Sequence, residues 1–143
     1  QPELITPYNE VECGDHYARA LASWGVYLAL AGFEHHGPKG HLGFAPKVTP
    51  DDFRAAFTTA EGWGTFQQAR KGGRQTERIT VAWGKLRLKT LSFAVSVPRQ
   101  SVSVTVDGQA VPATTEGENG RRVITLQREV TLEEGATIEI QFA

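Results

Sequence analysis

The chain has 143 residues, of which 40% are hydrophobic and 22% charged, and its formal net charge at pH 7 is −1. These values are typical of one soluble globular domain, or of a small domain with an appended element, and the near-neutral charge argues against a nucleic-acid partner, which usually requires a basic face. No apolar run reaches the roughly 18 residues of a membrane span, and the single cysteine excludes an internal disulfide.

The N-terminal segment indicates a piece of a larger protein. The chain begins at Gln1 and contains no methionine, so we interpret it as a processed or excised piece, or as one chain of a nicked enzyme. Pro2 and Pro7 favour an extended conformation before the first regular element. The one cysteine, Cys13, leaves the cellular compartment open. Of the compartments available, we favour a bacterial cytoplasm.

A helix is predicted from about His16 to Ala31. Asp15 is a suitable N-cap, because its carboxylate can accept from the free N–H groups of the first turn, and Gly32 is a suitable C-terminal stop. Apolar and small residues surround this segment on every side instead of forming one stripe. A helix of that composition is expected to be buried all round.

The rest of the sequence cannot supply that burial. No second helix of comparable strength is present, and the stretch from Asp51 to Thr59 fits two helical turns or a strand nearly equally well. We therefore expect a larger helical body, contributed by missing sequence or by another chain. The predicted organisation is a C-terminal element of a helical domain over residues 1–38, followed by a β domain over 39–143.

From His41 onward the pattern changes to short β-strands. Apolar residues alternate with polar ones in a series of short runs: Leu42–Pro46, Ile79–Trp83, Leu86–Leu88, Leu91–Val97, Val102–Val106, Ile124–Leu126, Val130–Leu132 and Ile138–Phe142. Asp107-Gly108 is a strong hairpin signal, and Glu134-Gly135 marks another turn. Seven or eight strands at this spacing predict an antiparallel sandwich or jelly roll. The fold class is therefore mixed but mainly β.

The ionisable residues are concentrated at the start of the predicted helix. Glu10, Glu12, Asp15, His16 and Arg19 lie within ten positions. If the helix is buried, the guanidinium of Arg19 needs a carboxylate partner, and Glu10 or Glu12 could supply it. One interpretation is therefore a structural ion pair, a Glu–Arg clamp that fixes the N-terminal segment to the helix. The other is a sugar pocket, in which a carboxylate accepts from vicinal hydroxyls and the guanidinium donates to the same hydroxyls.

Other chemical groups of the sequence favour structural roles. His35, His36 and His41 lack the spacing of zinc ligands and are expected in a loop, and no cofactor or metal is expected. Trp63, between two glycines, could stack on a sugar but is predicted to be a core residue. The segment Arg70–Gln75 (RKGGRQ) is expected to be a flexible surface loop.

Two stretches together resemble the C-terminal end of the catalytic region of glycoside hydrolase family 116. They are NEVECGDHYARALASWGVYLALAGFEHHGPKGHLGFAP and FRAAFTTAEGWGTF, and the resemblance covers roughly residues 1 to 66. The segment N-E-x-E-C-G-x-H-Y-A-R is the most specific part of this resemblance. The sequence after Gln75 holds no motif of that family. The family includes bacterial β-glucosidases and non-lysosomal glucosylceramidases. The resemblance implies a retaining β-glycosidase whose predicted helix is the last inner helix of an (α/α)6 toroid.

The same resemblance implies that this chain binds sugar but holds no catalytic residue. Retaining glycosidases use two carboxyl groups about 5 Å apart, and in the family both come earlier in the polypeptide. A glutamate and an arginine nine positions later contact sugar hydroxyls there; these positions are Glu10 and Arg19 here. Glu12 is an alternative to Glu10, and His16 is a further candidate. The implied partners are a larger chain carrying the rest of the catalytic domain and a carbohydrate substrate.

Three other interpretations stay open. The chain could be a non-catalytic carbohydrate-binding or structural β module whose helix docks to a neighbour, which exposed Trp63 or Trp83 on a flat sheet face would favour. It could be an interaction subunit, for which an exposed apolar helix without a sugar pocket would be the sign. It could also belong to an (α/α)6 hydrolase or lyase of different chemistry, because a fold does not fix a function.

Overall fold

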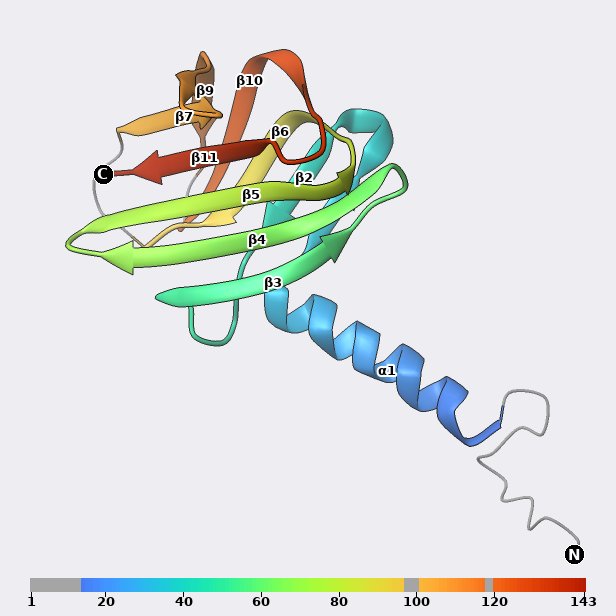
Figure 1. Cartoon of the computed structure of the whole chain (residues 1–143). Coiled ribbons are helices and arrows are strands. Elements are labelled where there is room, and N and C mark those ends of the chain that lie inside the picture. Colours follow the sequence, from blue (N-terminus) through green and yellow to red (C-terminus); the bar gives the residue numbers. More distant parts are fainter. Residues whose placement is uncertain (1–13, 97–100, 118–119) are drawn as a thin grey trace, which may run out of the picture.

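The computed structural model describes residues 14–96, 101–117 and 120–143, with side chains described from Ala20 onward. One helix projects from a two-sheet β structure (Figure 1). Within the described residues, no helix has the length and apolarity needed to cross a membrane. The elements are α1 (Gly14–Ala31), β1 (Glu34–His36), η1 (Gly37–Lys39), β2 (His41–Phe44), β3 (Asp52–Thr58), β4 (Gly62–Lys71), β5 (Arg74–Gly84), β6 (Leu86–Ala94), β7 (Val102–Val106), β8 (Gln109–Ala110), β9 (Ala113–Glu116), β10 (Arg121–Leu132) and β11 (Thr137–Phe142).

The predicted helix is present and ends where the sequence indicates. Gly32 adopts a left-handed conformation with φ of 57°. Its N–H donates to the carbonyl of Ala29 and the Phe33 N–H donates to that of Leu28, which is the Schellman arrangement. The N-cap prediction for Asp15 is wrong, because the helix begins at Gly14 and places Asp15 in its first turn.

The strands form two sheets with the β-rich, sandwich-like arrangement that the alternation predicts. The five-stranded sheet has the order β1-β2-β6-β10-β9, and the six-stranded sheet the order β3-β4-β5-β11-β7-β8. Among the described residues all strand pairs are antiparallel except β2 with β6, which run parallel, so the two sheets are antiparallel-rich, as the predicted sandwich requires, with one parallel pair added. The ambiguous stretch after Asp51 is strand β3, which forms one edge of the six-stranded sheet.

Two of the long strands contain irregularities that explain why each was predicted as two short strands. In β6 the side chains that face the core shift by one residue after Leu88. At this point Lys89 N–H and Thr90 N–H both donate to the carbonyl of Gly40. The register of β10 against β6 shifts between Thr125 and Val130. In β6 the buried positions move from Leu86 and Leu88 to Leu91 and Phe93, and in β10 the residues 127–129 are exposed, so in each strand the alternation breaks while the strand continues.

The core lies between the two sheets and is rich in phenylalanine. Phe44 of the five-stranded sheet stacks on Phe66 of the six-stranded sheet, with ring centroids 3.8 Å apart. Phe66 also contacts Phe53 and Phe93. All four side chains are buried, together with aliphatic residues from both sheets. This continuous cluster makes the two sheets one packed unit.

The segment Arg70–Gln75 is not a flexible loop, as the sequence suggested. It forms the hairpin between β4 and β5, in which Arg70 pairs with Gln75 and Gly72-Gly73 make the turn. The side chain of Gln75 is fully buried and accepts from Arg70 Nε at 2.9 Å. Two glycines with positive φ allow a tight turn that a glycine-rich sequence alone does not distinguish from a mobile loop.

Candidate functional site

The predicted sugar-binding residues lie at or beyond the end of the described chain. Glu10 and Glu12 fall outside the described residues. His16 and Arg19 belong to the first turns of α1, but their side chains are also outside the described part. Figure 1 shows that this half of α1 extends away from both sheets. The pairing of Glu10 with Arg19 therefore stays a prediction.

Among the described residues, the helix contacts the sheets through its C-terminal end. The carbonyls of Leu30 and Ala31 accept from Lys47 N–H and Ala45 N–H at 2.8 Å and 3.0 Å. The Tyr27 hydroxyl donates to the carbonyl of Ala56 on edge strand β3 at 2.6 Å. These contacts fix the position of the last turns of α1, and the described side chains before them, Ala20 to Val26, are exposed.

The apolar side chains of α1 are not buried by the described residues. Leu21 and Val26 are 59% and 58% exposed, and Trp24 and Leu30 are also exposed. At about 100° per residue these four side chains point to opposite sides of the helix. The expected all-round burial of α1 is thus not provided within the described part of this chain.

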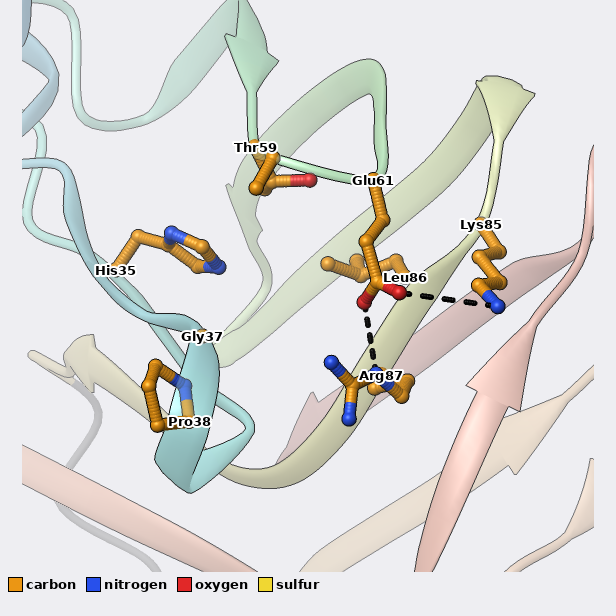
Figure 2. A pocket seen from close by; sticks show the side chains of 9 residues that line it. His35, Gly37, Pro38, Thr59, Glu61, Lys85, Leu86 and Arg87 are labelled. Atoms are coloured by element: carbon orange, nitrogen blue, oxygen red, sulfur yellow. Dashed lines mark hydrogen bonds and ion pairs between the residues drawn. The ribbon is translucent and has the colours of Figure 1, made fainter.

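A small pocket lies at one end of the sheets, between the β1–η1 segment and the turn that joins β3 to β4 (Figure 2). Glu61 accepts from Arg87 Nε at 2.7 Å and lies 3.7 Å from the ammonium of Lys85. The hydrogen bond from Arg87 lowers the pKa of Glu61, and burial lowers the pKa of His35 on the opposite wall. Glu61 is therefore a carboxylate at neutral pH.

This pocket is a poor candidate for catalysis or ligand binding. Its volume is about 180 Å³, below the roughly 300 Å³ at which small-molecule sites begin. Its carboxylate is already paired with two cations, and the partners are largely exposed. We interpret the Glu61–Arg87–Lys85 cluster as a surface ion-pair network that joins the β3–β4 turn to the start of β6.

The prediction that Trp63 is a core residue is wrong. Trp63 is 47% exposed, and its cross-strand partner Trp83 is 60% exposed. The register shift beside Trp63 leaves Ala82 unpaired, and this extra residue turns Trp83 to the same outer face as Trp63. Ile79, Val81 and Trp83 alternate in sequence, so the bulge is what removes Trp83 from the core.

A polar hollow occupies the same outer face of the six-stranded sheet, with a volume of about 500 Å³. Arg78 donates through Nε and Nη2 to Glu139 Oε2, at 3.1 Å and 2.6 Å. These hydrogen bonds lower the pKa of Glu139, so the pair is ionised at neutral pH. The hydroxyls of Thr80 and Thr137 hydrogen-bond to each other at 2.9 Å. The residues lining the hollow are Arg54, Thr65, Gln67, Arg78, Thr80, Thr105, Asp107, Gly108, Thr137 and Glu139.

The three histidines expected in a loop lie in or beside a short hairpin of β1, η1 and β2. His41 Nδ1 is 2.8 Å from the Thr90 hydroxyl, and its Nε2 lies 3.7 Å from Glu34. The carboxylate of Glu34 also pairs with Arg121. Among the described residues, no three His, Cys, Asp or Glu side chains gather closely enough to hold a metal ion.

Comparisons with known proteins find two glycoside hydrolases among the solved structures of partly similar fold. No family model and no curated protein matches the chain. One structural neighbour is Ara127N, a GH127 β-L-arabinofuranosidase from Geobacillus stearothermophilus T6, at 15% identity and a TM-score of 0.48 over 88% of this chain and 18% of that one. Another is the α-L-rhamnosidase of Dictyoglomus thermophilum, at 12% identity and a TM-score of 0.43 over 80% of this chain and 12% of that one. The chain therefore spans less than a fifth of either glycosidase, and neither neighbour is described as a family 116 enzyme.

Proposed function

We propose that this chain is the C-terminal part of a retaining β-glycosidase, in which α1 packs into a helical catalytic body and the strands form a supporting sandwich. Residues 1–38 contribute the last element of that body, and residues 39–143 the sandwich. Glu10 and Arg19 bind hydroxyls of the non-reducing sugar, while the nucleophile and the acid/base come from the preceding sequence. The role of the chain in catalysis is to hold the sugar so that its anomeric carbon is correctly oriented.

The observation that carries this proposal is the exposed apolar surface of α1. Leu21 and Val26, on opposite sides of the helix, are each more than half exposed. An isolated helix of this length is marginal in water, and most helical stability in proteins comes from packing. A single sheet or helix packed against α1 could cover one side of it only, whereas a bundle of surrounding helices covers all of its sides. The segment resembling family 116 includes this helix.

The test is kinetic and uses the longer protein that carries this chain. Glu10→Gln and Arg19→Lys should each reduce kcat/KM for 4-nitrophenyl β-D-glucopyranoside by about 100-fold or more, with little change in Tm. Glu133→Gln and Arg128→Lys, at exposed positions of the sandwich, serve as matched controls. Parallel losses of activity and of Tm would instead support a structural Glu–Arg clamp.

A second candidate function is a non-catalytic carbohydrate-binding or structural module whose helix docks to a neighbouring chain. The joint exposure of Trp63 and Trp83 on one face favours it. The two candidates differ in whether the chain completes an active site. In the second, Arg19→Lys leaves the turnover of the neighbouring enzyme unchanged.

A further inference from the structure

We propose that the outer face of the six-stranded sheet is a binding site for a neutral oligosaccharide, with Trp63 and Trp83 as its stacking platform. This site is separate from the sugar pocket proposed around Glu10 and Arg19. It rests on the second candidate function, for which it names the ligand class and the site, and it is independent of the first, because it requires neither catalytic activity nor a particular partner for α1.

The first observation is that two exposed tryptophans occupy paired positions on the outer face of the sheet. Trp63 on β4 and Trp83 on β5 are direct cross-strand partners, whose Cβ atoms are typically about 5 Å apart. Both rings are about half exposed, and neither contacts another aromatic ring among the described residues. An exposed indole offers apolar surface and a polar N–H, which suits a ligand that is apolar on one side and hydroxylated at its edge, as a pyranose ring is.

The bulge between β4 and β5 gives this arrangement a rigid basis. Gly64 follows Trp63 at the register shift, and a Cβ on it would lie 2.0 Å from the Thr80 carbonyl oxygen. Only glycine permits this close approach of the two strands. The two tryptophans are therefore carried by paired strands and not by a mobile loop. Gly64 is needed beside Trp63 because the strands approach each other closely there.

The second observation is the polar hollow that continues from the platform along the same face. Thr65 and Gln67 follow Trp63 on the outer side of β4 and line the hollow. From Trp63 to Gln67 the strand rises by roughly 13 Å, a span that suits a chain of several sugar rings. Hydroxyl, amide and ionised groups line it, and each can donate to or accept from sugar hydroxyls.

The charges of the hollow select a neutral ligand. Its lining includes two arginines and two acidic residues, so these charges balance. Arg78 and Glu139 already pair with each other, and a neutral hydroxyl can join that pair without a counterion. A single-stranded nucleic acid would also stack on tryptophan, but such ligands require a positively charged groove along the backbone. A protein partner would find only two apolar side chains beside a polar centre.

The experiment titrates the full chain with cellohexaose, laminarihexaose and xylohexaose, and with an oligothymidylate, by isothermal calorimetry. We expect saturable binding of at least one glycan and weaker or no binding of the oligothymidylate. Trp63→Ala and Trp83→Ala should each weaken glycan binding about tenfold. Trp24→Ala is the matched control, because Trp24 on α1 is also 47% exposed and its loss should leave affinity unchanged.

Two further variants distinguish the loss of a binding contact from misfolding of the variant protein. Trp83→Phe keeps an aromatic face and should bind more tightly than Trp83→Ala, and Gln67→Ala should weaken binding about threefold without touching either indole. The proposal is overturned if none of the three glycans binds, if the oligothymidylate binds more tightly than they do, or if Trp24→Ala weakens binding as much as Trp83→Ala.

Discussion

Gln68 on β4 and Glu77 on β5 are direct cross-strand partners, and both side chains are buried on the face of the six-stranded sheet that faces the core. Gln68 Oε1 and Glu77 Oε2 each lack a hydrogen-bond partner among the described residues. Both atoms are acceptors if Glu77 is ionised. A proton on Glu77 would give the pair a donor and would allow both atoms to be satisfied at once.

The surroundings of Glu77 favour its protonated form. Burial raises the pKa of Glu77 to about 8, although a hydrogen bond from Gln75 and the charge of Arg70 act in the opposite direction. The Gln75 amide donates to Glu77 Oε1 at 2.6 Å and to the carbonyl of Ala94. Arg70 is itself engaged with Gln75. At neutral pH the folded chain therefore holds a neutral carboxylic acid in its interior.

The first prediction concerns stability as a function of pH. Between pH 4.5, the usual pKa of a glutamate, and about pH 8, the folded chain binds one proton more than the unfolded chain. The free energy of unfolding therefore falls as pH rises through this window, by up to about 5 kcal/mol, and this contribution levels off above it. Urea titrations at a series of pH values measure the slope.

Glu77→Gln is the control for that slope, because glutamine supplies the missing donor at every pH. We expect the variant to lose this part of the pH dependence and to be more stable than the parent chain at pH 8.5. Parallel pH profiles for the two proteins would show that Glu77 is ionised in the folded state.

The second prediction concerns the end of α1. Gly32 has positive φ, and an added Cβ would lie 2.4 Å from the Ala45 carbonyl oxygen. Gly32→Ala should therefore lower the free energy of unfolding by more than about 2 kcal/mol. Gly108 also has positive φ but meets no atom within 4 Å, so Gly108→Ala should cost only about 1 kcal/mol. Equal costs in urea unfolding would mean that the contact with Ala45 does not hold α1 against the sheets.

The third prediction contrasts a core aromatic residue with an exposed one. Phe66 is fully buried among other phenylalanines, and Phe66→Ala should cost about 3 to 5 kcal/mol. Trp83→Ala removes a larger side chain but should cost less than about 1 kcal/mol, because the indole is mostly solvated. Thermal unfolding of the two variants checks the contrast. A large loss in Trp83→Ala would place Trp83 in the core, as the alternation of β5 suggests.

The sequence was sufficient to predict the main elements of the fold. The apolar run ending at Gly32 identified α1, and the period-2 alternation identified most of the strands. Both signals are local: a glycine that can adopt positive φ stops a helix, and side chains of a half-buried strand alternate.

The features that could not be predicted depend on strand pairing. Ala82 creates a bulge only because Trp63 pairs with Trp83, and the change of phase in β6 depends on the carbonyl of Gly40. Similarly, Gln75 and Glu77 are polar residues on the inward face of β5, where Gln75 hydrogen-bonds to Glu77 and also to Arg70 and the carbonyl of Ala94, residues distant from one another in sequence. Of the candidate site, the sequence singled out Trp63 but predicted the wrong environment for it.

The central claim, that α1 belongs to a larger helical body, is tested most directly by hydrogen exchange of the chain alone. We predict that amides of α1 from Ala20 to Leu28 exchange with opening free energies near zero, while those of β5 show the protection of the global fold. This applies at concentrations where the chain is monomeric; at higher concentration the chain should self-associate through the exposed apolar side chains of α1, and the protection of α1 should rise with it. A monodisperse monomer in which α1 is protected as strongly as β5 would contradict the claim.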